Sequence, residues 1–198
     1  MKFKEFKDKS FDNPDLFNHV RSALLFGKGK MYGKVEGAVA QKEGERVLDV
    51  CCGTGEFSAL FNTNYVGIDI CDSFLDFARR KYSKEFVHMD ATKLDFKDKE
   101  FSKTIFISGM HHFSEDNLAK IYPELSRVTS ERIVILDPVP QKYNPVAWLL
   151  YSMDRGACIR EVEKQKEIVS RYFDIEKIDV FQSFLYRLSV ISCRPKVQ

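Results

Sequence analysis

The residues from Val47 to Phe57 read "VLDVCCGTGEF" and give the strongest local indication of the fold. Its first part is a short apolar run that ends at turn residues, which is typical of a buried strand. Two glycines follow, and glycines at such a turn let the backbone approach a ligand closely. A short helix is expected over 54–62, and the next strand over 64–70. The stretch therefore predicts a strand, a ligand-binding loop and a helix in succession.

Strand and helix patterns alternate along the rest of the chain. Strands are expected at 45–51, 64–70, 85–90, 101–109, 131–137, 174–183 and 185–193. Helices are expected at 12–27, 30–41, 72–82, 114–128 and 159–172. Pro123 is expected to kink or split the helix over 114–128. This order favours an α/β fold with a doubly wound parallel sheet and helices on both faces. The last two strands are joined by a turn too short for a parallel crossover, so seven strands are expected, the last one antiparallel.

The composition is that of a globular chain: 198 residues, 44% hydrophobic, 30% charged and a formal net charge of +2. The near-neutral balance gives no electrostatic case for a nucleic-acid partner, and no apolar run is long enough to span a membrane. The cysteines and histidines lack metal-binding spacings, so no metal site is expected. The first residues lack a signal-peptide core, which predicts a cytoplasmic location.

Three aspartates narrow the choice of ligand. Asp49 precedes the glycine loop, Asp69 ends the second strand and Asp90 ends the third. Ligands of doubly wound sheets bind at the carboxyl ends of the strands, so these carboxylates are expected to serve one site. A carboxylate there can accept hydrogen bonds from ribose hydroxyls or from an exocyclic amine. Three of them disfavour phosphates and favour a ligand with a ribose, an adenine and a positive charge, as in S-adenosylmethionine.

At these residues the sequence resembles the class I S-adenosylmethionine-dependent methyltransferases. Their motif, acid-x-Gly-x-Gly-x-Gly, reads Asp49-Val50-Cys51-Cys52-Gly53-Thr54-Gly55 here, and the double cysteine is similar to the ubiquinone and menaquinone methyltransferase branch. The resemblance continues through "YVGIDICDSFLDFAR", "FVHMDATKLDF" and "SGMHHFSED" and covers about residues 44–137. It implies a Rossmann-like fold and S-adenosyl-L-methionine as the cofactor.

We expect a single methyltransferase domain over residues 1–198. Its expected parts are an N-terminal helical cap (1–41), a cofactor-binding core (44–137), a substrate cap and helix (138–172) and a C-terminal hairpin (173–195). The segment 143–160, with the only tryptophan, is expected either to line an apolar substrate pocket or to form a core helix with a dimer contact. The chain is expected to be a monomer or a homodimer.

The resemblance implies how the methionine end of the cofactor is held. Gly53 and Gly55 let the chain pass beneath it, and Cys51 replaces the first glycine of the motif. Asp49 supports this loop, or the cofactor ammonium through water. Ser108 faces the same end from the fourth strand.

The resemblance also implies how the adenosine end is held. Asp69 binds the ribose hydroxyls, and Ile70 packs against the adenine. Asp90 accepts a hydrogen bond from the adenine amine, with Ala91 beside it.

Two adjacent histidines, His111 and His112, follow the fourth strand at the mouth of this site. A histidine there can take a proton from the attacking atom, because its ordinary pKa lies near neutrality. For each histidine a packing or cofactor-lining role is an open alternative. The expected acceptor is a small molecule, apolar or aromatic.

Three other functions fit parts of the sequence less well. An NAD(P)-binding oxidoreductase would use Gly53–Ser58 as G-x-G-x-x-G, but the third glycine is a serine and no Tyr-x-x-x-Lys is present. An RNA methyltransferase would call for a basic face. A non-catalytic cofactor-binding scaffold is disfavoured by the intact Gly53, Gly55, Asp69 and Asp90.

Overall fold

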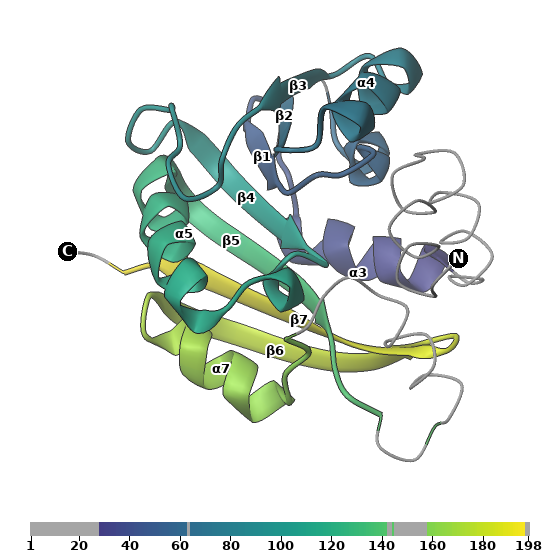
Figure 1. Cartoon of the computed structure of the whole chain (residues 1–198), viewed down its shortest axis with the longest axis vertical. Helices are drawn as coiled ribbons and strands as arrows, with labels where there is room; N and C mark the ends of the chain where they lie inside the picture. Colours follow the sequence, from purple (N-terminus) through teal and green to yellow (C-terminus); the bar gives the residue numbers. More distant parts are fainter. Residues whose placement is uncertain (1–27, 63, 142–143, 145–157, 197–198) are drawn as a thin grey trace, which may run out of the picture.

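The computed structural model describes residues 28–62, 64–141, 144 and 158–196. Within these residues, seven strands form a mixed sheet in the order β3-β2-β1-β4-β5-β7-β6 (Figure 1). The strands are β1 (Val47–Val50), β2 (Tyr65–Asp69), β3 (Glu85–His88), β4 (Phe101–Ile107), β5 (Thr129–Pro138), β6 (Phe173–Ser183) and β7 (Tyr186–Pro195). Neighbours among β1 to β5 pair in parallel, whereas β7 is antiparallel to both β5 and β6. The predicted α/β sheet with a reversed last strand is confirmed.

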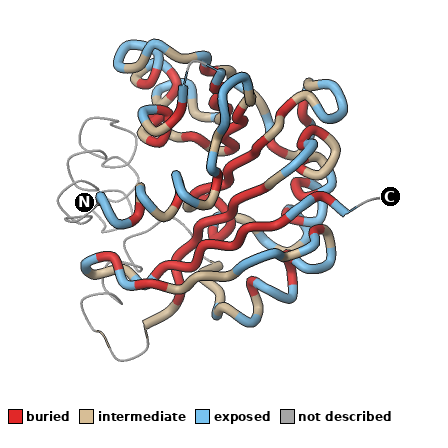
Figure 2. Tube along the Cα trace, turned by 180° about the vertical axis from the view of Figure 1, so that it is seen from behind, coloured by how far each residue is buried: buried red, intermediate tan, exposed pale blue. Residues whose placement is uncertain are grey.

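Helices pack on both faces of the sheet. The α-helices are α3 (Lys28–Val39), α4 (Asp72–Lys81), α5 (Glu115–Val128) and α7 (Val162–Ser170), and two 3₁₀ helices are η1 (Glu56–Leu60) and η2 (Met110–His112). Successive residues of β5 alternate between two core clusters. Ile133 and Ile135 pack in the cluster that contains α5 and α7, and Val134 and Leu136 pack in the one that contains α3 and α4. The sheet is therefore buried between two helical layers (Figure 2).

The other elements lie within a few residues of their expected bounds. The helix expected over 159–172 is the shorter α7, and the one over 30–41 begins earlier as α3. The helix expected over 12–27 lies outside the described residues, as does most of the segment 143–160 expected to line a substrate pocket or to form a core helix. No helix in the described part of the chain is long and apolar enough to cross a membrane.

The helix expected over 54–62 is wrong in type and length, because the structure has only the 3₁₀ helix η1 there. Its N-cap, Gly55, has a left-handed backbone with φ 72° and offers no side-chain acceptor to the free N–H groups. The segment closes instead with short-range bonds, from the N–H of Ser58 to the carbonyl of Gly55 and from Phe61 to Ser58. Such i to i+3 bonds make a tighter turn than an α-helix.

Pro123 does not split its helix, because α5 runs unbroken from Glu115 to Val128. The ring of Pro123 lies on the exposed side of α5, together with Ala119, whose carbonyl loses its helical donor. Water can satisfy that carbonyl there. The opposite side buries a row of large side chains, Leu118, Ile121, Tyr122, Leu125 and Val128. Packing of this face offsets the lost backbone hydrogen bond.

The glycine loop packs closely against its neighbours at Gly55. A Cβ atom at this position would lie 2.7 Å from the ring of Phe86 on β3 and 3.0 Å from Cβ of Ala78 on α4. The positive φ of Gly55 adds a second reason for glycine, since L side chains disfavour this conformation. The close approach seats the loop against β3 and α4.

We expect Gly55→Ala to lower the free energy of unfolding by about 2–5 kcal/mol, the sum of left-handed strain and overpacking. The matched control is Gly33→Ala on α3, where an added Cβ meets nothing within 4 Å. That control should raise the free energy of unfolding by up to about 1 kcal/mol. Urea titrations followed by circular dichroism measure both. Equal stability of Gly55→Ala and the parent protein would contradict the packing described here.

Candidate cofactor and active site

The chain turns in opposite directions after β1 and β4, which are neighbours in the sheet. After β1 it continues to β2 on one side, and after β4 to β5 on the other, so a topological switch point lies between them. The residue just beyond each strand has a left-handed backbone although it is not glycine: Cys51 with φ 58° and Ser108 with φ 52°. Such conformations are unfavourable and cluster at functional sites. Both predicted residues therefore flank the place where a ligand of this fold binds.

Asp69 connects the glycine loop to the turn that follows β2. Its Oδ2 accepts a hydrogen bond from the N–H of Gly53 at 2.9 Å, and its Oδ1 accepts one from the N–H of Cys71 at 2.9 Å. An ionised carboxylate has about four acceptor positions, so each oxygen can accept a further bond. The carboxylate is thus fixed in place and still able to accept the two hydroxyls of a ribose.

Asp49 lies in β1, two residues before Cys51, and is 1% exposed. Its Oδ2 accepts a hydrogen bond from the hydroxyl of Tyr65 at 2.6 Å. Burial, followed by the charge of Asp49, raises the pKa of Tyr65 well above its ordinary value, so the tyrosine keeps the proton that it donates. Sequence reasoning missed Tyr65, although it begins the strand that pairs with β1.

The charges of all three acids act on the thiol of Cys51. Its pKa is raised first by burial and then by the charges of Asp69, Asp49 and Asp90. Burial also raises the pKa of Cys52. Both residues therefore stay as thiols rather than thiolates, which are the reactive form of cysteine. The structure thus places the predicted aspartates in or just after neighbouring strands, and the cysteines of the loop beside them are unreactive.

Asp90 lies at the open side of the site. Its Oδ1 accepts hydrogen bonds from the N–H and the hydroxyl of Thr92, both at 2.8 Å, which hold the pKa of Asp90 below its ordinary value. Ile70 follows Asp69 and is 67% exposed, an unusual exposure for a large apolar side chain. Ala91, in contrast, is buried in the core. This side of the candidate site thus combines fixed carboxylates with an exposed apolar side chain.

These groups fit S-adenosylmethionine in their chemistry. The three carboxylates suit a ligand with hydroxyls, an amine and positive charge, and they disfavour a pyrophosphate. An added Cβ at Gly53 would meet only the ring of Phe74, at 3.9 Å, so one side of the loop backbone is open to a ligand. In the described part of the chain, no three His, Cys, Asp or Glu side chains gather as a metal site requires.

The two histidines lie in different environments. His111 is 2% exposed, and its Nδ1 lies 2.8 Å from Oδ1 of Asp137 at the end of β5. Burial raises the pKa of Asp137, and the charge and hydrogen bonds of His111 oppose that shift. His112 is exposed, and its ring centroid lies 4.2 Å from that of His111. His112 is therefore the histidine that faces solvent.

Arg160 holds the turn that contains both histidines. Its Nη1 donates to the carbonyls of Met110 and Cys158, and its Nη2 donates to the carbonyl of Phe113 at 2.7 Å. The N–H of Cys158 donates to the carbonyl of His111. Sequence reasoning missed the contact of Asp137 with His111 and the bonds of Arg160 to the turn. Each of these contacts joins segments that are far apart in the chain.

Comparisons with known proteins agree with this geometry. A family model described as a methyltransferase domain matches residues 47–132. An uncharacterized protein of Methanocaldococcus jannaschii is 32% identical over 79% of this chain and 63% of its own. The demethylmenaquinone methyltransferase of Clavibacter sepedonicus is 37% identical over 52% of this chain and 46% of its own. The chain therefore spans between about half and two thirds of the length of these relatives.

A solved structure shows the same fold at low sequence identity. The magnesium protoporphyrin IX methyltransferase of Synechocystis, with bound S-adenosylhomocysteine, superimposes with a TM-score of 0.69 at 17% identity. The match covers 89% of this chain and 87% of that one. The sheet order, the glycine loop and the matched family model agree with one another. The chain has the fold of the class I S-adenosylmethionine-dependent methyltransferases and resembles them in sequence over residues 47–132.

Proposed function

We propose that this protein transfers a methyl group from S-adenosyl-L-methionine to a small apolar or aromatic molecule. The observation that supports this most strongly is the placement of Asp49, Asp69 and Asp90 in or just after three neighbouring strands, β1, β2 and β3. A cationic nucleoside matches that charge, whereas a dinucleotide with its phosphates does not. The proposal includes a single domain, a monomeric or homodimeric state and a cytoplasmic location.

The residues that would hold the cofactor divide between its two ends. Asp69 would accept hydrogen bonds from the ribose hydroxyls, and Asp90 would accept one from the adenine amine. Ile70 would pack against the adenine ring. Gly53, Ser108 and the loop supported by Asp49 would border the methionine end. The cofactor, when bound, supplies a methyl group made electrophilic by a sulfonium.

The chain's own contribution is mainly to position the reactants. Holding an acceptor in line with the methyl group contributes on the order of 7–11 kcal/mol to lowering a barrier of this kind. Exposed and next to the buried His111–Asp137 pair, His112 would take the proton that an oxygen or carbon nucleophile loses. The turn that contains His112 is held from behind by Arg160.

We infer the class of methyl acceptor from the names of the relatives and not from the geometry of the site. Besides the Clavibacter enzyme, a relative in Synechocystis is named 2-phytyl-1,4-naphtoquinone methyltransferase and is 31% identical over 48% of this chain. Both names point to apolar quinone rings. A quinol or phenol is accordingly the acceptor that we propose first.

Isothermal titration calorimetry should detect binding of S-adenosylhomocysteine. Asp69→Asn should weaken it by about ten- to a hundredfold, since a hydrogen bond to a charged group contributes about 1.5–3 kcal/mol. The control Asp76→Asn removes an exposed carboxylate of α4 that pairs with Arg79, and it should bind as the parent does. Binding of NADH without binding of S-adenosylhomocysteine would rule out the proposed function.

His112→Ala should lower kcat by about a hundredfold or more, within the range typical of general base catalysis. Cofactor affinity should be unchanged, because the proposed role of His112 concerns the acceptor. Parallel turnover and calorimetry measurements test both parts. Unchanged turnover would exclude His112 as the base.

Transfer of a radiolabelled methyl group should be seen with a quinol or phenol acceptor. The panel also includes fatty acids, amines and RNA, each at the same concentration. We expect quinols and phenols to give the fastest transfer. Transfer to RNA alone would contradict the acceptor class while leaving the cofactor assignment intact.

A further inference from the structure

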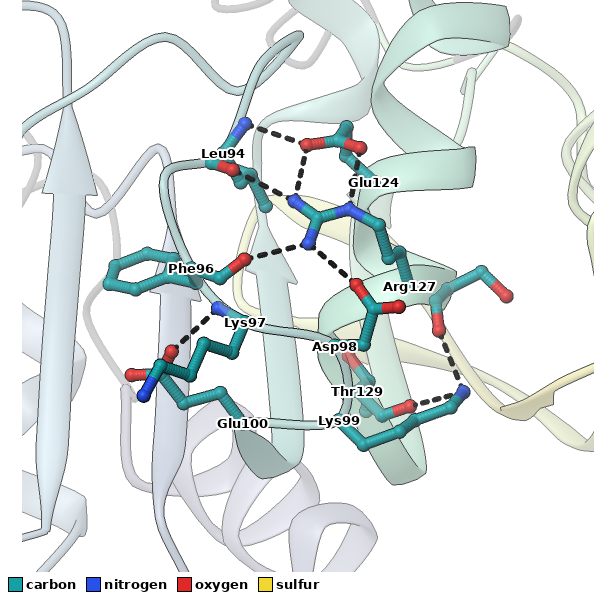
Figure 3. A network of polar contacts seen from close by, with 10 residues as sticks. Leu94, Phe96, Lys97, Asp98, Lys99, Glu100, Glu124, Arg127 and Thr129 are labelled. Atoms are coloured by element: carbon teal, nitrogen blue, oxygen red, sulfur yellow. Dashed lines mark hydrogen bonds and ion pairs between the residues drawn. The ribbon is translucent and has the colours of Figure 1, made fainter.

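An arginine on α5 holds the loop that leaves the proposed adenine site (Figure 3). Arg127 donates from Nε to Oε1 of Glu124 at 2.9 Å. From Nη1 it donates to the carbonyl of Phe96 at 2.7 Å and to Oδ1 of Asp98 at 2.9 Å. From Nη2 it donates to the carbonyl of Leu94 and to Oε2 of Glu124, both at 2.8 Å. Every one of the five donors of a guanidinium therefore has an acceptor.

Leu94 is held through both of its backbone groups. Its carbonyl accepts from Arg127, and its N–H donates to Oε2 of Glu124 at 2.7 Å. Its side chain is 4% exposed and packs in the core. Arg127 and the N–H of Leu94 hold the pKa of Glu124 below its ordinary value, and Glu124 and Asp98 raise that of Arg127. The pair is ionic at neutral pH.

Leu94 is one of two anchors for the segment that contains Asp90. The first anchor is the N–H of Met89, which donates to the backbone carbonyl of Asp69 at 3.0 Å. Between the anchors the carbonyl of Asp90 accepts from the N–H of Lys93 at 3.0 Å, which forms a turn. The position of the Asp90 carboxylate is therefore set from β2 on one side and from α5 on the other.

The bidentate pair of Arg127 with Glu124 contributes to stability, because it belongs to a network of charged and polar groups. The guanidinium fork also fixes the direction of the groups that it binds. Here those groups include two backbone carbonyls of the loop, those of Leu94 and Phe96.

We propose that Arg127 and Glu124 are positioning residues for adenine recognition. They fix Leu94 and, through the turn from Asp90 to Leu94, the carboxylate that accepts the adenine amine. This inference rests on the proposed function. It predicts that loss of Arg127 removes the preference for adenine over a base without the amine.

The experiment compares two ligands by calorimetry, S-adenosylhomocysteine and S-inosylhomocysteine. The second has a carbonyl oxygen where adenine has its amine. The unaltered protein should prefer the adenine ligand by about tenfold or more, because the wrong base leaves a polar group unpaired. Asp90→Ala should reduce the preference to about one, and so should Arg127→Ala. Combining the two substitutions should cause no further reduction, since they act on one contact.

Two further variants keep the test decisive. Arg171→Ala removes an arginine that pairs with Glu167 and Glu115, away from this loop, and it should keep the preference. Glu124→Gln keeps the size of the side chain and should reduce the preference, even if Arg127→Ala fails to fold by circular dichroism. Equal weakening of both ligands, with the preference intact, would overturn the positioning role. If the unaltered protein binds neither ligand, the proposed function itself is wrong.

Discussion

The carboxylate of Asp69 is the interaction around which the site is arranged. It joins the N–H of Gly53 in the first loop to the N–H of Cys71 in the second. This is possible because β1 and β2 pair in parallel, with Val50 opposite Ile68, so that both strands end at the same edge. The backbone carbonyl of Asp69 also accepts from Met89, which brings the end of β3 to the same point. Three strand ends are thus connected through one residue.

The tight turn η2 places the adjacent residues His111 and His112 in different environments. In the 3₁₀ helix η2 each residue is rotated by about 120° from the previous one. His111 accordingly lies inside, against Asp137, and His112 lies outside. The buried His111–Asp137 pair holds the turn η2 in place. The exposed ring of His112 is the one that a methyl acceptor can reach. The pattern His-His alone does not distinguish these positions.

The adjacent cysteines of the first loop have a structural explanation. Burial and nearby carboxylates raise the pKa of both thiols, which removes the basis for redox or nucleophilic chemistry. Cys51 instead takes a left-handed backbone at the end of β1, and Cys52 packs in the core. The family motif has glycine at the position of Cys51. In this chain Cys51 takes the positive φ at that position, at a cost in backbone strain.

Local sequence patterns were enough to predict the seven strands, the reversed last strand and the positions of Asp49, Asp69 and Asp90 at or near strand ends. These features follow from the spacing of apolar residues, the turn residues and the lengths of the connections. The α-helix expected over 54–62 is not formed, because a left-handed glycine without a capping side chain favours the shorter 3₁₀ helix η1.

The side chains that support the site became evident from the three-dimensional packing. Tyr65 donates to Asp49 across 16 positions of sequence, Asp137 meets His111 across 26, and Arg127 reaches Leu94 across 33. Sheet register and helix packing bring these partners together, and no local pattern records either one. Pro123 is tolerated for the same reason, since the buried face of α5 contributes more than one lost hydrogen bond. Local sequence places the polar side chains at the strand ends, and long-range packing determines how rigidly those side chains are positioned.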